Sequence, residues 1–173
     1  AQRADLLARL LALAQPGRWF VIAGSLPVGV EPAFVVDLIQ RLRAVGAKVV
    51  IDSSGAALAA ALEAGVDLAK PNQYELAECA GVDANDPDAL LSAARQLRRE
   101  CVPQLIVSLG AEGALFLSAD AELRTRAPQV QVVSTVGAGD ALLAGYLQGV
   151  LAGDDCEGCA RRATVYARSR LES

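Results

Sequence analysis

Short apolar segments alternate with longer amphipathic segments along this chain, and that alternation is the feature that most limits its fold. The apolar segments are rich in Val, Ile and Leu and end at turn residues; they cover residues 18–23, 48–52, 66–69 and 104–109. Parallel strands that are covered on both faces produce this pattern. We therefore expect an α/β protein with a doubly wound, mostly parallel sheet and helices on both faces.

The segments between these strands carry the periodicity and the end signals of helices. Phe34, Leu38 and Leu42 recur at helical spacing, and Gly46 follows as a C-terminal signal. Asp86 precedes a proline at a first helical position, which favours a capped helix start. On these grounds we predict helices over residues 5–14, 34–45, 56–64, 72–80, 87–100, 138–151 and 155–168.

The period changes in one place, because residues 114–118 and 123–126 indicate a hairpin around residues 119–121. No internal repeat or low-complexity linker divides the chain. We therefore expect residues 1–173 to belong to one domain.

Composition excludes several classes of protein. The chain has 173 residues, of which 53% are hydrophobic, so it is long enough for a buried core and is not disordered. No apolar run approaches the ~18 residues of a membrane span. Sixteen basic and twenty acidic residues give a net charge of −4 without a basic block. We expect no membrane or nucleic-acid partner, and an anionic ligand would need local positive potential.

The first residue is Ala1, and the chain contains no methionine or histidine, so we expect a fragment or a processed chain. Its four cysteines are too few for a disulfide framework, which favours a reducing cytoplasm. Cys156 and Cys159 have CxxC spacing, but zinc would need two further ligands, and the context of a redox motif is absent. We interpret that pair as incidental.

The most informative segment is Gly137-Ala138-Gly139-Asp140, which leads directly into an apolar helix. Its glycines permit a tight turn, and the amides of Ala138, Gly139 and Asp140 are expected to point out of a helix N-terminus, where an anion is favoured. A carboxylate there would repel phosphate, so its presence suggests a chemical role, such as accepting the proton of an attacking hydroxyl. The alternative is that Asp140 only interacts with the helix dipole.

Other phosphate-binding motifs are excluded. The chain has no Walker-type loop, and a dinucleotide-binding fingerprint would need a third glycine where Leu142 stands.

Five motifs occur in the order and spacing of the PfkB (ribokinase-like) carbohydrate kinases, and together they extend over nearly the whole chain. They are Gly24-Ser25-Leu26-Pro27, Asp52-Ser53-Ser54-Gly55, Lys70-Pro71-Asn72-x-x-Glu75, Ser108-Leu109-Gly110-Ala111-Glu112-Gly113 and Ser134-Thr135-Val136-Gly137-Ala138-Gly139-Asp140. The chain thus resembles that family, and the residues in its motifs most resemble those of 1-phosphofructokinases and tagatose-6-phosphate kinases.

The resemblance implies a role for each matching residue. Asp140 matches the catalytic base that deprotonates the sugar hydroxyl, and Gly137, Ala138 and Gly139 match the anion hole for the transferred phosphoryl group. Asn72 and Glu75 match a motif associated with Mg²⁺, through water, and with the ATP phosphates.

The remaining matches concern the nucleotide and the sugar. Lys70, Ser108, Gly110 and Gly113 match residues along the ATP phosphates. Gly24 and Ser25 match a segment that opens toward the substrate cleft.

Each of these roles has a structural alternative. Asn72 serves equally well as a helix N-cap after Pro71, and Lys70 as a solvated lysine at a strand end. Ser108, Gly110 and Gly113 fit a plain turn between strands.

At the level of the whole protein, the resemblance implies a cytoplasmic, Mg²⁺-dependent kinase that transfers the γ-phosphoryl of ATP to a phosphorylated ketohexose. Fructose 1-phosphate is the first choice, and a tagatose-6-phosphate or ribokinase-like specificity is the second. The N-terminal strands and the β lid of the family pattern are absent from this chain, as is part of its C-terminal end. We therefore expect the 173 residues to be inactive alone, and the full-length protein to form a homodimer. The alternative from another class is a non-catalytic nucleotide-binding fragment.

Overall fold

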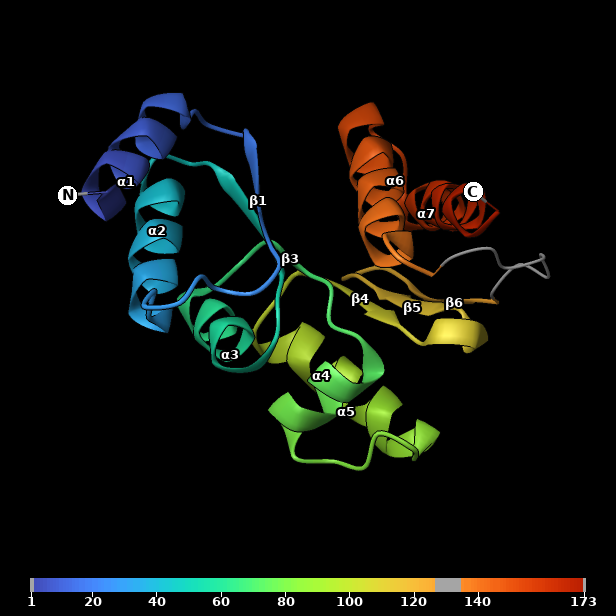
Figure 1. Cartoon of the computed structure of the whole chain (residues 1–173). Helices are drawn as coiled ribbons and strands as arrows, with labels where there is room; N and C mark the ends of the chain where they lie inside the picture. The colour runs from blue at the N-terminus through green and yellow to red at the C-terminus, as the bar shows by residue number, and fades with distance from the viewer. Residues whose placement is uncertain (1, 127–134, 173) are drawn as a thin grey trace. The chain divides into compact units, whose positions relative to one another are not determined.

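A computed structural model describes residues 2–126 and 135–172 (Figure 1). They fold as two compact units, which divide between Pro103 and Gln104. The first unit contains, in chain order, α1 (Gln2–Leu13), β1 (Trp19–Ala23), α2 (Pro32–Ala44), β2 (Lys48–Asp52), α3 (Gly55–Ala64), β3 (Leu68–Ala69), α4 (Gln73–Ala80) and α5 (Pro87–Glu100).

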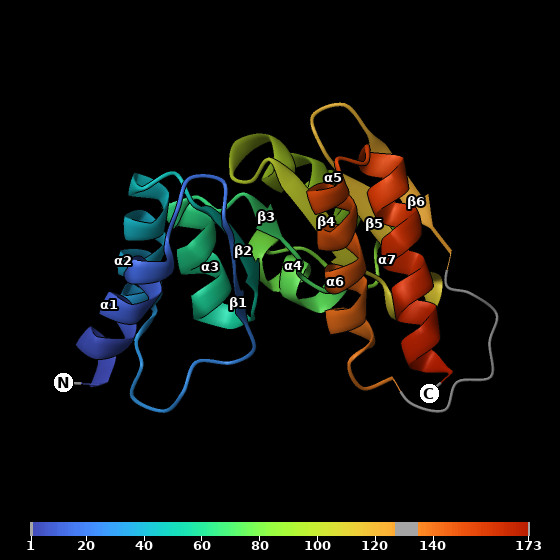
Figure 2. The same ribbon diagram turned by 90° about the horizontal axis from the view of Figure 1, so that it is seen from above.

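Strands and helices of the first unit form a parallel α/β layer. β1 pairs in parallel with β2, and β2 in parallel with β3. Helices α2 and α3 pack against each other and against β2, and Figures 1 and 2 both show them on one side of these strands. The predicted α/β class is confirmed.

The core of the first unit comes from apolar positions on its strands and helices. Ile39, Leu42, Val49, Ile51 and Leu58 are each 1% exposed or less. Burying a side chain of this size contributes about 1.5–3 kcal/mol. Of the α2 positions that set the predicted periodicity, Leu38 and Leu42 are buried and Phe34 is half-buried, so the pattern identified the buried face of α2 in part.

β3 is shorter than the predicted strand over residues 66–69. The carboxylate of Asp67 accepts a hydrogen bond from the Val49 amide at 2.9 Å and pairs with the Lys48 ammonium at 2.8 Å. The Asp67 amide also donates to the Val49 carbonyl at 2.8 Å, so the amide and side chain of Asp67 together satisfy Val49, and regular ladder pairing begins at Leu68.

The second unit is an antiparallel sheet covered by two helices. It contains β4 (Gln104–Ser108), a 3₁₀ turn (Gly110–Glu112), β5 (Ala114–Leu117), β6 (Glu122–Thr125), α6 (Ala138–Ala152) and α7 (Cys156–Leu171). β5 pairs antiparallel with both β4 and β6, which confirms the predicted hairpin. The parallel pairing expected for most of the sheet is therefore found in the first unit.

Aromatic packing connects α6 to this sheet. The rings of Phe116 on β5 and Tyr146 on α6 stack with centroids 5.7 Å apart. The Tyr146 hydroxyl donates a hydrogen bond to the Gln104 side chain at 3.1 Å, so its polar end is satisfied although the residue is only 3% exposed.

Two glycines on α6 bring this helix into backbone contact with α7. A Cβ atom on Gly145 would lie 2.7 Å from the Arg162 carbonyl oxygen, and one on Gly149 would lie 2.8 Å from the Cys159 Cα. Distances this short leave no room for any side chain at either glycine. The two helices are therefore held at a fixed and close separation.

Within the part of the chain that the structure describes, no helix combines the length and apolar character required to cross a lipid bilayer.

Candidate active site

The carboxyl ends of the three parallel strands carry most of the predicted residues of the first unit. Gly24 follows β1, and its amide donates to the Asp52 carbonyl at 2.9 Å, while its carbonyl accepts from the buried Ser53 hydroxyl at 2.8 Å. Ser25 is exposed beside it. Ligands of open α/β sheets bind outside this edge of the strands. Contact of Gly24 and Ser25 with a substrate stays a prediction.

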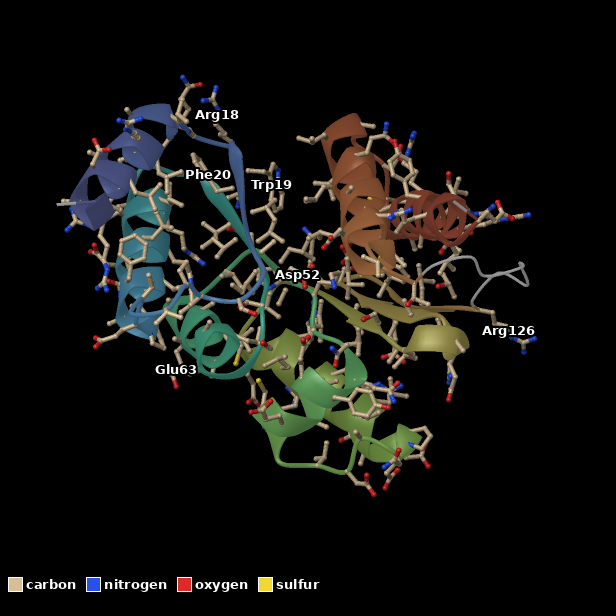
Figure 3. All side chains as sticks on the ribbon, in the orientation of Figure 1. Arg18, Trp19, Phe20, Asp52, Glu63 and Arg126 are labelled. Carbon is tan, nitrogen blue, oxygen red and sulfur yellow. The ribbon has the colours of Figure 1, made fainter. Side chains whose placement is uncertain are left out.

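Lys70 is a buried residue of this edge, which contradicts the alternative of a solvated lysine. Its side chain is 7% exposed, and its ammonium lies 3.0 Å from the Asp52 carboxylate (Asp52 is labelled in Figure 3). Asp52 belongs to one of the five motifs, and its pairing with Lys70 becomes evident only in the structure. A buried ion pair adds little net stability, but removing one partner leaves an uncompensated charge and costs ~3–5 kcal/mol.

Asn72 and Glu75 form a complete capping box at the start of α4. The Asn72 side-chain oxygen accepts from the amides of Tyr74 and Glu75 at 2.8 and 2.9 Å, and a Glu75 carboxylate oxygen accepts from the Asn72 amide at 2.8 Å. The predicted N-cap role of Asn72 is therefore confirmed. These bonds use both lone pairs of the Asn72 oxygen but only one oxygen of the Glu75 carboxylate.

The predicted nucleotide residues of the second unit lie at the turn between β4 and β5. Ser108 ends β4, the Leu109 amide donates to the Gly113 carbonyl at 2.8 Å, and Gly110 and Gly113 have φ angles of +57° and +99°. The turn geometry by itself requires both glycines. Their contact with nucleotide phosphates stays a prediction.

Gly137 and Asp140 define the N-terminus of α6. Gly137 is the N-cap residue with a φ of +78°, and no side chain caps the helix there. Asp140 is exposed and is the acidic residue of the first turn. In contrast to α4, whose N-terminus is closed by its own side chains, α6 presents its first amides without a side-chain cap.

One of the three predicted anion-binding amides is engaged within the chain. The Ala138 amide donates to the Thr135 carbonyl at 3.2 Å. Gly139 and Asp140 occupy the next two positions of the helix, whose amides have no intrahelical acceptor. The turn into the helix therefore uses the Ala138 donor, and contact of these amides with an anion stays a prediction. Ser134, the first residue of the motif, lies outside the described residues.

A hollow of about 400 Å³ adjoins this helix start, lined by Ala141, Val165, Tyr166, Ser169 and Arg170. A Cβ atom on Gly137 would lie 3.2 Å from the Arg170 side-chain Nε. Sequence reasoning missed Arg170, because only the packing of α7 on α6 brings it to the loop.

No group of three or more Cys, Asp or Glu side chains among residues 2–126 and 135–172 forms a metal site by itself. Mg²⁺ commonly takes only one or two carboxylates from a protein and the rest of its ligands from water and phosphates. The Glu75 carboxylate fits that pattern, whereas the Asn72 oxygen is committed to the cap.

The Cys159 thiol is unsuited to nucleophilic chemistry. Burial raises the pKa of the Cys159 thiol to about 11, and the thiol donates to the Asp154 carbonyl at 3.6 Å. A thiol with this pKa is protonated near neutral pH and is a poor nucleophile. These observations support the interpretation of the CxxC spacing as incidental.

Comparison with known proteins agrees with this geometry. The family model described as pfkB family carbohydrate kinase matches residues 1–173. The 1-phosphofructokinase of Escherichia coli (strain K12) is 41% identical over 146 residues, which are 84% of this chain and 47% of that protein. The 1-phosphofructokinase of Xanthomonas campestris pv. campestris is 41% identical over 98% of this chain and 54% of that protein.

A solved structure shows the same fold. The crystal structure of phosphofructokinase-2 from Escherichia coli in complex with potassium superposes with a TM-score of 0.94 and 31% identity, over 99% of this chain and 56% of that chain. The chain thus spans about half the length of the relatives it matches. It belongs to the pfkB family of carbohydrate kinases.

Proposed function

We propose that this chain forms the phosphoryl-transfer part of an ATP-dependent kinase that acts on a phosphorylated ketohexose. The observation that carries the proposal is the start of α6, where a glycine N-cap leaves the helix dipole without a side-chain cap and an exposed carboxylate, Asp140, stands in the first turn. An open helix N-terminus favours an anion, and a carboxylate beside it suits a general base.

In the proposed reaction, Asp140 accepts the proton of a sugar hydroxyl while that oxygen attacks the γ-phosphorus of ATP. The bond between the γ-phosphorus and the bridging oxygen breaks, and ADP leaves with the electron pair. The amides of Gly139 and Asp140 stabilise the charge on the transferred group. Gly137 supplies the left-handed N-cap backbone ahead of these amides.

Support for the co-substrates comes from both units, taken separately. The hollow beside α6 offers space next to the phosphoryl site, and Glu75 offers a carboxylate oxygen to a water of the Mg²⁺ shell. When bound, Mg²⁺ would neutralise charge on the ATP phosphates. Lys70, Ser108, Gly110 and Gly113 are proposed to lie along the nucleotide.

For the acceptor we propose fructose 1-phosphate, with a homodimer as the assembly of the full-length protein. Relatives named 1-phosphofructokinase are 41% identical, whereas the solved phosphofructokinase-2 is 31% identical. Gly24 and Ser25 are proposed to face the sugar. Turnover with tagatose 6-phosphate but not with fructose 1-phosphate would reverse this choice.

The test is Asp140→Asn in the intact protein, with release of ADP as the measurement. The amide keeps the shape of the side chain but accepts no proton, so we expect kcat to fall by about 10²–10⁴-fold while MgATP affinity stays within about twofold. Asp120→Asn, which removes an exposed carboxylate at the β5–β6 turn, serves as the control and should leave both values unchanged. Retained turnover in Asp140→Asn would refute the assignment of the base.

A further inference from the structure

Arg170 is held against the start of α6 by the packing of α7. Backbone contact at Gly145 and Gly149 sets the separation of the two helices. Arg170 lies in the last turn of α7, and its Nε, Cδ and Cγ atoms all lie within 4 Å of the position that a Cβ on Gly137 would occupy. The side chain therefore rests on the side of Gly137 that the absent Cβ leaves open.

Charge makes this position informative. The Asp140 carboxylate stands in the first turn of the same helix and would repel the phosphates of a nucleotide. A cation beside this turn offsets that repulsion. The chain as a whole has a net charge of −4, so attraction for a polyanion has to arise locally.

We propose, building on the function proposed above, that Arg170 is a phosphate-binding residue, whose guanidinium contacts the phosphates of the nucleotide at the N-terminus of α6. Arg170 also lines the hollow beside Ala141 and Ser169, so a ligand phosphate at the helix start would lie at the mouth of that space. The planar guanidinium donates two parallel hydrogen bonds to phosphate oxygens, which an ammonium does not reproduce.

The experiment compares Arg170→Gln with Arg168→Gln in the intact protein. Arg168 lies in the same last turn of α7 and pairs with Glu172 at 3.1 Å, so its loss removes the same charge at a different place. Binding of ATP, ADP and adenosine is measured by calorimetry, and thermal unfolding is followed for each variant. Adenosine has no phosphate, so it reports on any structural damage to the hollow.

We expect Arg170→Gln to weaken ATP at least about tenfold and adenosine less than about twofold, with Arg168→Gln unchanged and Arg170→Lys in between. Equal losses in the two glutamine variants, or equal weakening of ATP and adenosine, would each overturn the proposal. Failure of the proposed function can be distinguished from failure of the Arg170 proposal alone. Wild-type protein that binds no ATP refutes both proposals, whereas ATP binding that is indifferent to Arg170→Gln refutes only this one.

Discussion

At the scale of single residues, Asn72 and Glu75 show how one pair serves a helix and still has capacity for a ligand. The capping box engages the Asn72 oxygen fully and one oxygen of Glu75. The structural role thus belongs to both residues, whereas the proposed metal role falls on the second oxygen of Glu75. Two substitutions separate these roles.

We expect Glu75→Gln to keep the cap, since glutamine also reaches back to the N-cap amide, and to raise the Mg²⁺ concentration needed for half-maximal activity. Asn72→Ala should instead lower the free energy of unfolding by about 1 kcal/mol. Urea unfolding and Mg²⁺ titration of turnover measure the two effects. The control is Glu78→Gln, an exposed acid of the same helix. Unchanged Mg²⁺ dependence in Glu75→Gln would show that the helix start is a cap and nothing more.

At the scale of elements, the contact between α6 and α7 brings the start of α6 next to the end of α7. The contact depends on Gly145, although alanine has a higher intrinsic helix propensity than glycine. Propensity predicts that Gly145→Ala stabilises the helix by up to about 1 kcal/mol. A Cβ atom 2.7 Å from the Arg162 carbonyl oxygen predicts the opposite.

We expect the packing effect to prevail, so that Gly145→Ala lowers the free energy of unfolding by ~1–3 kcal/mol. Ala144→Gly, at the exposed neighbouring position, measures the propensity difference separately. Both variants are compared by urea unfolding followed by circular dichroism. A more stable Gly145→Ala protein would show that the helices separate at no cost, and it would remove the structural basis for placing Arg170.

At the scale of the whole molecule, the chain spans about half the length of its relatives. Phosphoryl transfer depends on positioning both substrates and on excluding water. Among the described residues, β1 pairs with β2 on one side only, and Val21 on that strand is 47% exposed. An open, apolar strand edge favours association with other chains.

We therefore expect a polypeptide of residues 1–173 alone to show no ADP release above background with fructose 1-phosphate and MgATP, and to self-associate. A coupled ADP assay and light scattering measure these outcomes. The intact protein, assayed in parallel, is the positive control. A monodisperse monomer with turnover would contradict this expectation.

Several features could be predicted from neighbouring residues in the sequence alone. Asp86 caps α5 through bonds to Asp88 and Ala89 at 3.0 and 3.1 Å, and the β5–β6 hairpin formed as its pattern indicated. Such features depend on residues within a few positions of one another, so the sequence by itself determined them. Five motifs in register likewise indicated the family, because each motif is a short segment with its own backbone demands.

Tertiary structure decided the features that join distant segments. Lys70 meets Asp52 in a buried pair across two strands, and Arg170 reaches Gly137 through the packing of two helices. Residues far apart in the sequence become neighbours only when the strands align and the helix backbones touch, and no local pattern encodes that distance. The glycine at the start of α6 is thus readable from the sequence, whereas packing decided which cation stands beside it.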